Sequence, residues 1–112
     1  MARSLRFSTE LVTFVEFEQR RRVIPARILD QLLRAGTSVG AHNAEAESAL
    51  TRRHLLALRG RALQEAQEAQ YWLKVIAGRA NAHSPDAVRH LLAQLSELVA
   101  ILTTCVRKLK GE

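Results

Sequence analysis

Apolar residues recur along most of the chain at the three- and four-residue spacing of an α-helix. The most regular run lies near the C-terminus, where spacings of four and three alternate through Val88, Leu92, Leu95, Val99, Leu102, Val106 and Leu109. This alternation is the heptad seam of a left-handed helical bundle. Leu91, Leu98 and Cys105 form a second row beside it. We expect a subunit interface along that row, and the alternative is a wider core-facing stripe within one protomer.

The pattern predicts four helices with short connections between them. Ser84, Pro85 and Asp86 are typical of a helix start, because they supply a cap, a proline at the first position and a charge that complements the helix dipole. The expected helices cover about residues 5–22, 25–46, 51–80 and 85–109. Because short connections make sequential helices antiparallel neighbours, the predicted fold is all-α. It is an antiparallel up-down-up-down four-helix bundle that spans residues 1–112 as one domain.

Two glycines interrupt the middle of the second expected helix. Gly36 and Gly40 each cost about 1 kcal/mol relative to alanine. They share a helix face, and bare backbone on one face lets another helix approach closely. We therefore expect other helices to pack on Gly36 and Gly40, with the second helix as the central element of the bundle. In the first helix we expect Phe7, Leu11 and either Phe14 or Val15 to share the buried face and Glu18 to lie outside it.

The composition agrees with a helical protein. Apolar residues make up 47% of the 112 residues and aromatic residues only 4%, a mixture that does not favour β-sheet. Cys105 is the only cysteine, so no internal disulfide can form and no cysteine cluster can hold zinc. No apolar run approaches the ~20 residues that span a bilayer, and the N-terminus does not resemble a signal peptide. We expect a cytoplasmic protein that has no contact with membranes.

The charge favours a polyanionic partner. The formal net charge is +6, from 17 basic and 11 acidic residues, and most of the basic residues are arginines, whose planar fork suits phosphate oxygens. The candidate nucleic-acid contacts are Arg20, Arg21, Arg22, Arg27, Arg52, Arg53, Arg59 and Arg61. In an up-down bundle Arg3 and Arg6 should join Arg52 and Arg53 at one pole. The alternative is a solvated basic surface without a partner.

Catalytic chemistry finds little support in the sequence. Di-iron bundles use paired Glu-x-x-His motifs, whereas His42 and Glu45 form a single pair in reversed order, for which we expect local hydrogen bonding. Cys105 should be a buried, inert thiol. Trp72 should lie at the core edge or under a neighbouring subunit. We therefore predict no catalytic residue, no metal and no cofactor.

The middle of the chain resembles a known family. The segments that carry the resemblance are Leu33-Arg34-Ala35-Gly36-Thr37-Ser38-Val39-Gly40-Ala41, Ala44-Glu45-Ala46, Ala62-Leu63-Gln64-Glu65-Ala66 and Tyr71-Trp72-Leu73. They are similar to the 23S ribosomal RNA intervening-sequence proteins. The resemblance implies antiparallel four-helix bundles that assemble into homopentamers. It also implies kinship with the accessory variability determinant of diversity-generating retroelements, a basic pentamer that works with a reverse transcriptase and nucleic acid.

The chain departs from the family pattern at three positions. His42 stands where asparagine is expected, and Arg59 and Arg61 stand where apolar residues are expected. These departures argue against carrying over the family's surface and partner in detail.

Three functional hypotheses follow. The first is a non-enzymatic homo-oligomer, a pentamer by resemblance, that contacts RNA or DNA through Arg-rich surfaces and uses Trp72, Leu91 and Leu98 in its subunit interface. The alternative is a protein-binding adaptor or scaffold that meets an acidic protein and has no nucleic-acid role. A third hypothesis, an enzyme with a metal site in the bundle core, lacks the second ligand pair that it needs.

Overall fold

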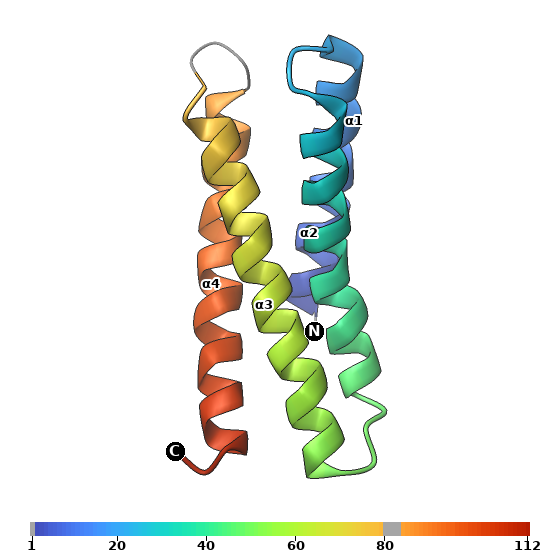
Figure 1. Ribbon diagram of the computed structural model, residues 1–112, viewed down its shortest axis with the longest axis vertical. Coiled ribbons are helices and arrows are strands. Elements are labelled where there is room, and N and C mark those ends of the chain that lie inside the picture. Colours follow the sequence, from blue (N-terminus) through green and yellow to red (C-terminus); the bar gives the residue numbers. More distant parts are fainter. Residues whose placement is uncertain (1, 80–83) are drawn as a thin grey trace.

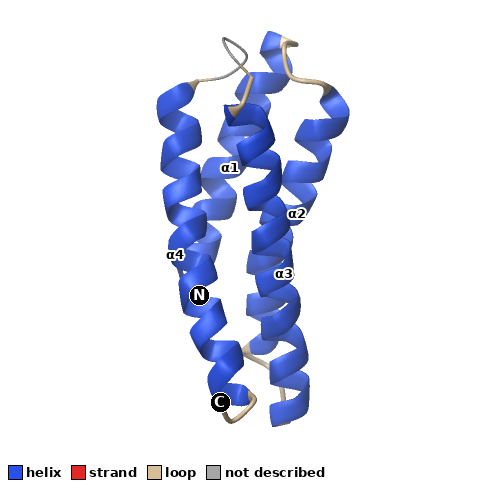
Figure 2. Ribbon diagram, turned by 60° about the vertical axis from the view of Figure 1, so that its left-hand side comes forward, coloured by secondary structure: helices blue, strands red, loops and turns tan. Residues whose placement is uncertain are grey.

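The computed structural model describes residues 2–79 and 84–112, and this part of the chain forms four helices and no strand (Figures 1 and 2). The helices are α1 (Ala2–Arg21), α2 (Ala26–Ala46), α3 (Arg52–Ala77) and α4 (Pro85–Leu109). They form a rod of 45 × 22 × 21 Å. The all-α class is confirmed. α1 begins earlier than the expected Leu5, α3 ends before the expected Ala80, and Ala80 itself lies outside the described residues.

Helix ends follow local chemistry in part. The Thr51 side chain accepts a hydrogen bond from the backbone N–H of His54 at 3.0 Å and so caps the start of α3. Pro85 occupies the first turn of α4, but the side chain of Ser84 makes no capping hydrogen bond. α1 ends where Arg22 adopts φ of +57°, in the left-handed region.

Each helix packs against two neighbours in a square arrangement. α1 contacts α2 and α4, and α3 contacts the same two helices from the other side. Asn43 near the end of α2 meets Ser4 near the start of α1 and Arg59 near the start of α3, so adjacent helices run in opposite directions. The expectation that α2 is the central element is wrong, because it occupies one corner of the square.

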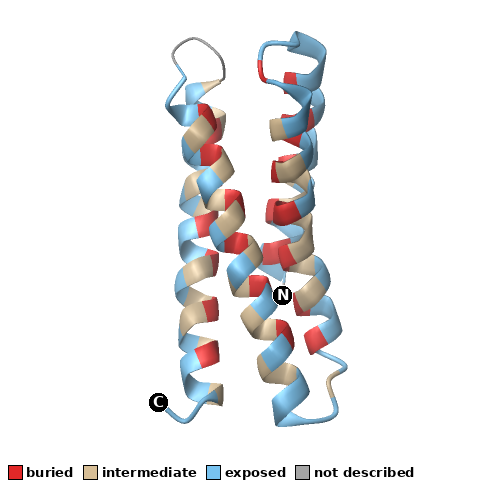
Figure 3. Ribbon diagram, viewed as in Figure 1, coloured by how far each residue is buried: buried red, intermediate tan, exposed pale blue. Residues whose placement is uncertain are grey.

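The core runs along the axis of the rod, and buried positions face inward on every helix (Figure 3). The buried residues of α4 are Val88, Leu91, Leu95, Leu98, Leu102 and Val106. Leu92 and Val99, which we expected on the seam, are only partly buried at its flank. Because the single chain buries Leu91 to 2% and Leu98 to 1% exposure, the predicted subunit contact through these two side chains is wrong. They belong to a wider core-facing stripe.

α1 approaches α2 closely across the two glycines. A Cβ atom on Gly36 would lie 2.2 Å from Cδ2 of Leu11 and 3.2 Å from Cε2 of Phe7. A Cβ atom on Gly40 would lie 3.3 Å from Oγ of Ser8. Both glycines lower the helix propensity of α2, but their lack of a side chain allows α1 to pack closely against it.

α1 does not reach the far pole of the rod. Arg3 pairs with Glu97 in the middle of α4, and Figure 1 shows the start of α1 well short of the end at which α3 begins and α4 finishes. The expectation that Arg3 and Arg6 join Arg52 and Arg53 at one pole is therefore wrong. None of the helices that the structure describes combines the length and apolar character that crossing a membrane requires.

Candidate nucleic-acid interface

The predicted arginines fall into separate places on the rod. Arg20, Arg21, Arg22 and Arg27 surround the turn between α1 and α2, which we call the first-turn pole. The start of α3 holds Arg52 and Arg53 at the opposite pole, while Arg59 and Arg61 lie further along α3 (Figure 1). The structure therefore does not unite them in one patch, and each must be judged by its own contacts.

Arg21 is committed to a buried carboxylate. Its Nη1 donates to Oε1 and Oε2 of Glu18 at 3.1 and 3.3 Å, and the Glu18 side chain is fully buried. Our expectation that Glu18 lies outside the core is wrong, because it continues the inward spacing of Phe7, Leu11 and Phe14. The guanidinium of Arg21 also lies 5.8 Å from the ring centroid of Phe17, a cation–π distance.

Arg52 is committed to the end of α4. It donates from Nε to the carbonyl of Leu109 and from Nη2 to the carbonyl of Lys108, both at 3.0 Å. The last carbonyls of a helix have no helical partner and carry its negative dipole end, so a guanidinium is well suited to them. Arg52 thus ties the start of α3 to the end of α4.

Arg59 completes a polar cluster inside the bundle. Its Nη1 donates to Oδ1 of Asn43 at 2.8 Å, and Nδ2 of Asn43 donates to Oγ of Ser4 at 2.9 Å. Asn43 is fully buried and Ser4 is 1% exposed. Sequence reasoning missed Ser4 and Asn43 as partners. The only signal was the unexpected Arg59 itself, together with a polar residue on an otherwise apolar stripe of α2.

The remaining predicted arginines are exposed. Within residues 2–79 and 84–112, no hydrogen bond or ion pair engages the side chains of Arg20, Arg22, Arg27, Arg53 and Arg61. Their guanidinium groups are therefore available to an external anion. Arg22 differs from the others in its left-handed backbone, which non-glycine residues seldom adopt.

A second charged network lies on the outer face of α2 and α3. Arg34 of α2 bonds to Glu65 at 3.2 Å and also to Glu68, and Trp72 Nε1 donates to Oε2 of Glu68 at 3.0 Å. The hydrogen bond from Trp72, and next that from Arg34, lowers the pKa of Glu68 below its ordinary value. Trp72 packs against the core edge, and Tyr71 meets it edge-on with ring centroids 5.1 Å apart. This network neutralises Arg34 internally.

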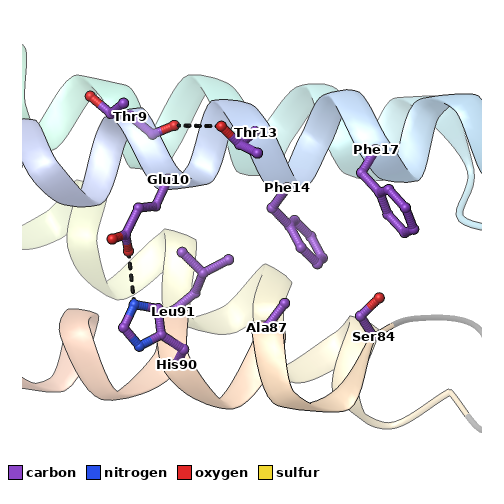
Figure 4. A pocket seen from close by; sticks show the side chains of 9 residues that line it. All are labelled: Thr9, Glu10, Thr13, Phe14, Phe17, Ser84, Ala87, His90 and Leu91. Atoms are coloured by element: carbon purple, nitrogen blue, oxygen red, sulfur yellow. Dashed lines mark hydrogen bonds and ion pairs between the residues drawn. The ribbon is translucent and has the colours of Figure 1, made fainter.

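A groove of about 490 Å³ opens between α1 and α4 (Figure 4). From α1, Phe14 projects toward Ala87 of α4, and Phe17 projects into the groove on the side of Ser84. At the other end His90 Nε2 lies 2.8 Å from Oε2 of Glu10. Because the two titratable groups of the groove bind each other, its lining adds no free cation to the basic surface.

Metal-ligating and nucleophilic groups are dispersed. Among the residues the structure describes, no three His, Cys, Asp or Glu side chains converge as metal ligands do. The Nδ1 atom of His42 is buried without a hydrogen-bond partner, so the expected bond to Glu45 does not form there. Cys105 is half-buried and unpaired, less enclosed than we expected.

Comparison with known proteins agrees with the fold. A crystal structure of a protein of unknown function from the S23 ribosomal protein family of Bacteroides thetaiotaomicron superposes with a TM-score of 0.86 at 27% sequence identity, covering 95% of this chain and 96% of the other. No curated protein matches the chain significantly. The family model described as 23S rRNA-intervening sequence protein matches residues 2–104. The chain therefore belongs to the 23S rRNA-intervening sequence protein family.

Proposed function

We propose that this protein is a non-enzymatic bundle that binds the phosphate backbone of nucleic acid through exposed arginines. The observation that carries the proposal is the division of arginines described above. Arg21, Arg52 and Arg59 serve the fold, whereas Arg20, Arg22, Arg27, Arg53 and Arg61 have no partner within the described residues. Unpaired guanidinium groups on a chain of net charge +6 suit phosphate oxygens in geometry and charge.

The surface favours backbone contact over base readout. Base recognition uses bidentate side chains in a groove or aromatic platforms for unstacked bases. The exposed aromatic side chains of the described surface are Phe17 and Tyr71, on different helices, and Phe17 is already covered by Arg21. We therefore propose binding with little dependence on sequence.

Direct titration tests the proposal. Fluorescence anisotropy of labelled RNA duplex, single-stranded RNA and DNA duplex, each titrated with the purified chain at low ionic strength, should show saturable binding. A variant with glutamine at the five unpaired arginine positions should lose that binding while keeping its helical circular dichroism. Absence of binding at low ionic strength would reject the proposal. Retention of polyglutamate in place of nucleic acid would favour the alternative of an acidic protein partner.

We also propose that the protein self-associates through the outer seam of α1 and α2. Leu5 and Val12 are 69% and 39% exposed and, seven residues apart, lie along one side of α1. Leu5 lines a hollow of about 490 Å³, and the other residues that line it include the small residues Gly40, Ala41 and Ala44 of α2. Small residues beside exposed apolar side chains support close approach of a helix from a second copy.

The mass of the particle in solution tests self-association. Light scattering coupled to size-exclusion chromatography should give a multiple of the 12.5 kDa protomer, five by family resemblance. Leu5→Glu should reduce that mass, and because Leu5 is exposed the protomer should keep its fold. Leu50→Glu is the matched control, since Leu50 is 96% exposed in the connection between α2 and α3. A monomeric wild-type protein would refute this part of the proposal.

A further inference from the structure

We propose that the first-turn pole is the site at which this protein grips nucleic-acid phosphates, and that Arg22 is its anchor. The inference rests on the proposed nucleic-acid binding and goes beyond it by choosing among the separate basic regions. Four observations support the choice: the backbone of Arg22, the way Arg21 is held, the hollow beside Arg20, and the position of Arg27 at the start of α2.

The backbone of Arg22 is unfavourable for the residue that occupies it. Arg22 has φ of +57°, the one positive φ among the described non-glycine residues. It follows the last residue of α1, and its N–H bonds to the carbonyl of Glu18 at 3.2 Å. Glycine is the usual residue at this position because it lacks the steric cost of a Cβ atom. The exposed side chain of Arg22 has no hydrogen-bond or ion-pair partner in the described structure, so no such contact offsets this steric cost.

The neighbouring side chain fixes the geometry of the turn. Glu18 is buried and holds the Arg21 guanidinium by an ion pair, so the two flanking arginines are the ones that remain without a partner in the described structure. Arg20 and Arg22 share a hollow of about 420 Å³ with Glu16 and Gln19. Two guanidinium groups and one carboxylate thus line the hollow, which leaves it net positive and with room for a phosphate group.

The start of α2 extends this positive site. Arg27 lies in the first turn of α2, is exposed and has no partner in the described structure. The positive end of the helix dipole lies in the same turn. Arg53, at the opposite pole, also lies in the first turn of a helix, but its backbone is not left-handed, and its neighbour Arg52 is bound to the carbonyls of α4.

Replacement of Arg22 by glycine tests the anchor without risk to folding. Arg22→Gly should raise the melting temperature, because glycine relieves the left-handed strain, and should raise the Kd for a labelled RNA duplex about threefold to tenfold. The slope of log K against log salt should become shallower by about one, as expected for one lost phosphate contact. Arg22→Lys should recover much of the affinity. A stabilised Arg22→Gly protein with unchanged affinity and slope would overturn the inference.

Two triple variants with equal loss of charge test the choice of pole. Arg20→Ala/Arg22→Gly/Arg27→Ala should weaken binding far more than Arg6→Ala/Arg107→Ala/Lys110→Ala, whose residues are exposed away from the first-turn pole. Equal weakening by the two triples would overturn the inference while leaving nucleic-acid binding intact. Failure of the wild-type protein to bind RNA at low salt would instead remove the proposed function, and the inference with it.

Discussion

Arg59 on α3 donates a hydrogen bond from Nη1 to Oδ1 of Asn43 on α2, at 2.8 Å, inside the bundle. Asn43 in turn donates a hydrogen bond from Nδ2 to Oγ of Ser4 on α1. One buried side chain therefore links three helices where α1 begins, and this explains an arginine at a position where the family pattern suggests an apolar residue. The link also withdraws Arg59 from the surface that could meet nucleic acid.

Loss of the Asn43 side chain should destabilise the protein. Asn43→Ala leaves the Ser4 hydroxyl and the Arg59 guanidinium without their partner, and we expect about 2–3 kcal/mol of lost unfolding free energy. Arg59→Met keeps most of the packing of the arginine stem and should cost less. Urea denaturation followed by circular dichroism measures both. Equal stability of Asn43→Ala and wild type would show that the cluster contributes nothing.

Breaking the buried ion pair near the end of α1 should also be costly. Arg21→Ala leaves the fully buried Glu18 carboxylate without its cation, and we expect a loss of about 2–4 kcal/mol. Arg20→Ala, one residue away and unpaired in the described structure, should change the free energy of unfolding by less than about 0.5 kcal/mol. Chemical denaturation of the two variants side by side provides the comparison. Similar values for both would mean that the pair is not stabilising.

The glycines of α2 and α3 should respond oppositely to alanine. At Gly36 a Cβ atom would collide with Cδ2 of Leu11 at 2.2 Å, so Gly36→Ala should cost about 1–3 kcal/mol despite its better helix propensity. At Gly60 a Cβ atom meets no other heavy atom within 4 Å, so Gly60→Ala should stabilise by up to about 1 kcal/mol. Thermal melting of both variants tests this. A stable Gly36→Ala protein would mean that α1 does not pack there.

Acid should weaken the contact between Trp72 and Glu68. Because the pKa of Glu68 is lowered in the folded protein from the usual 4.5, its contribution to stability is present above the unfolded-state pKa. That contribution is lost as the pH falls through the lower, folded-state value. Trp72 is the only tryptophan, so its fluorescence reports the protonation directly. The transition should have a midpoint below 4.5 and vanish in Glu68→Gln; a midpoint at or above 4.5 would contradict the contact.

The helices could be predicted from sequence because apolar spacing and the Ser-Pro-Asp start are local signals. The orientation of α4 could not be predicted, because Leu91 and Leu98 lie on a row as apolar as Leu92 and Val99, and only packing against α1 and α3 decides which row turns inward. Tertiary packing also decides which end of the rod α1 does not reach.

The arginines show the same limit for the candidate site. Sequence alone identified the basic residues, but it could not separate those that serve the fold from those that are free. Arg21, Arg52 and Arg59 find partners from 3 to 57 residues away in sequence, and such pairings depend on how the helices dock. Glu18 was misplaced for a related reason, since an inward carboxylate is expected only once a cation beside it is known.

The salt dependence of RNA binding tests the proposed phosphate contact most directly. For the wild-type protein and an RNA duplex, log K should fall as log salt rises between about 50 and 200 mM. The slope should be about −2.7 per bound protomer or steeper, which is the value for three phosphate contacts at about 0.9 each. These contacts are assigned to Arg20, Arg22 and Arg27. A slope near zero, or no binding at the lowest salt, would contradict the proposal that free arginines on this bundle hold nucleic-acid phosphates.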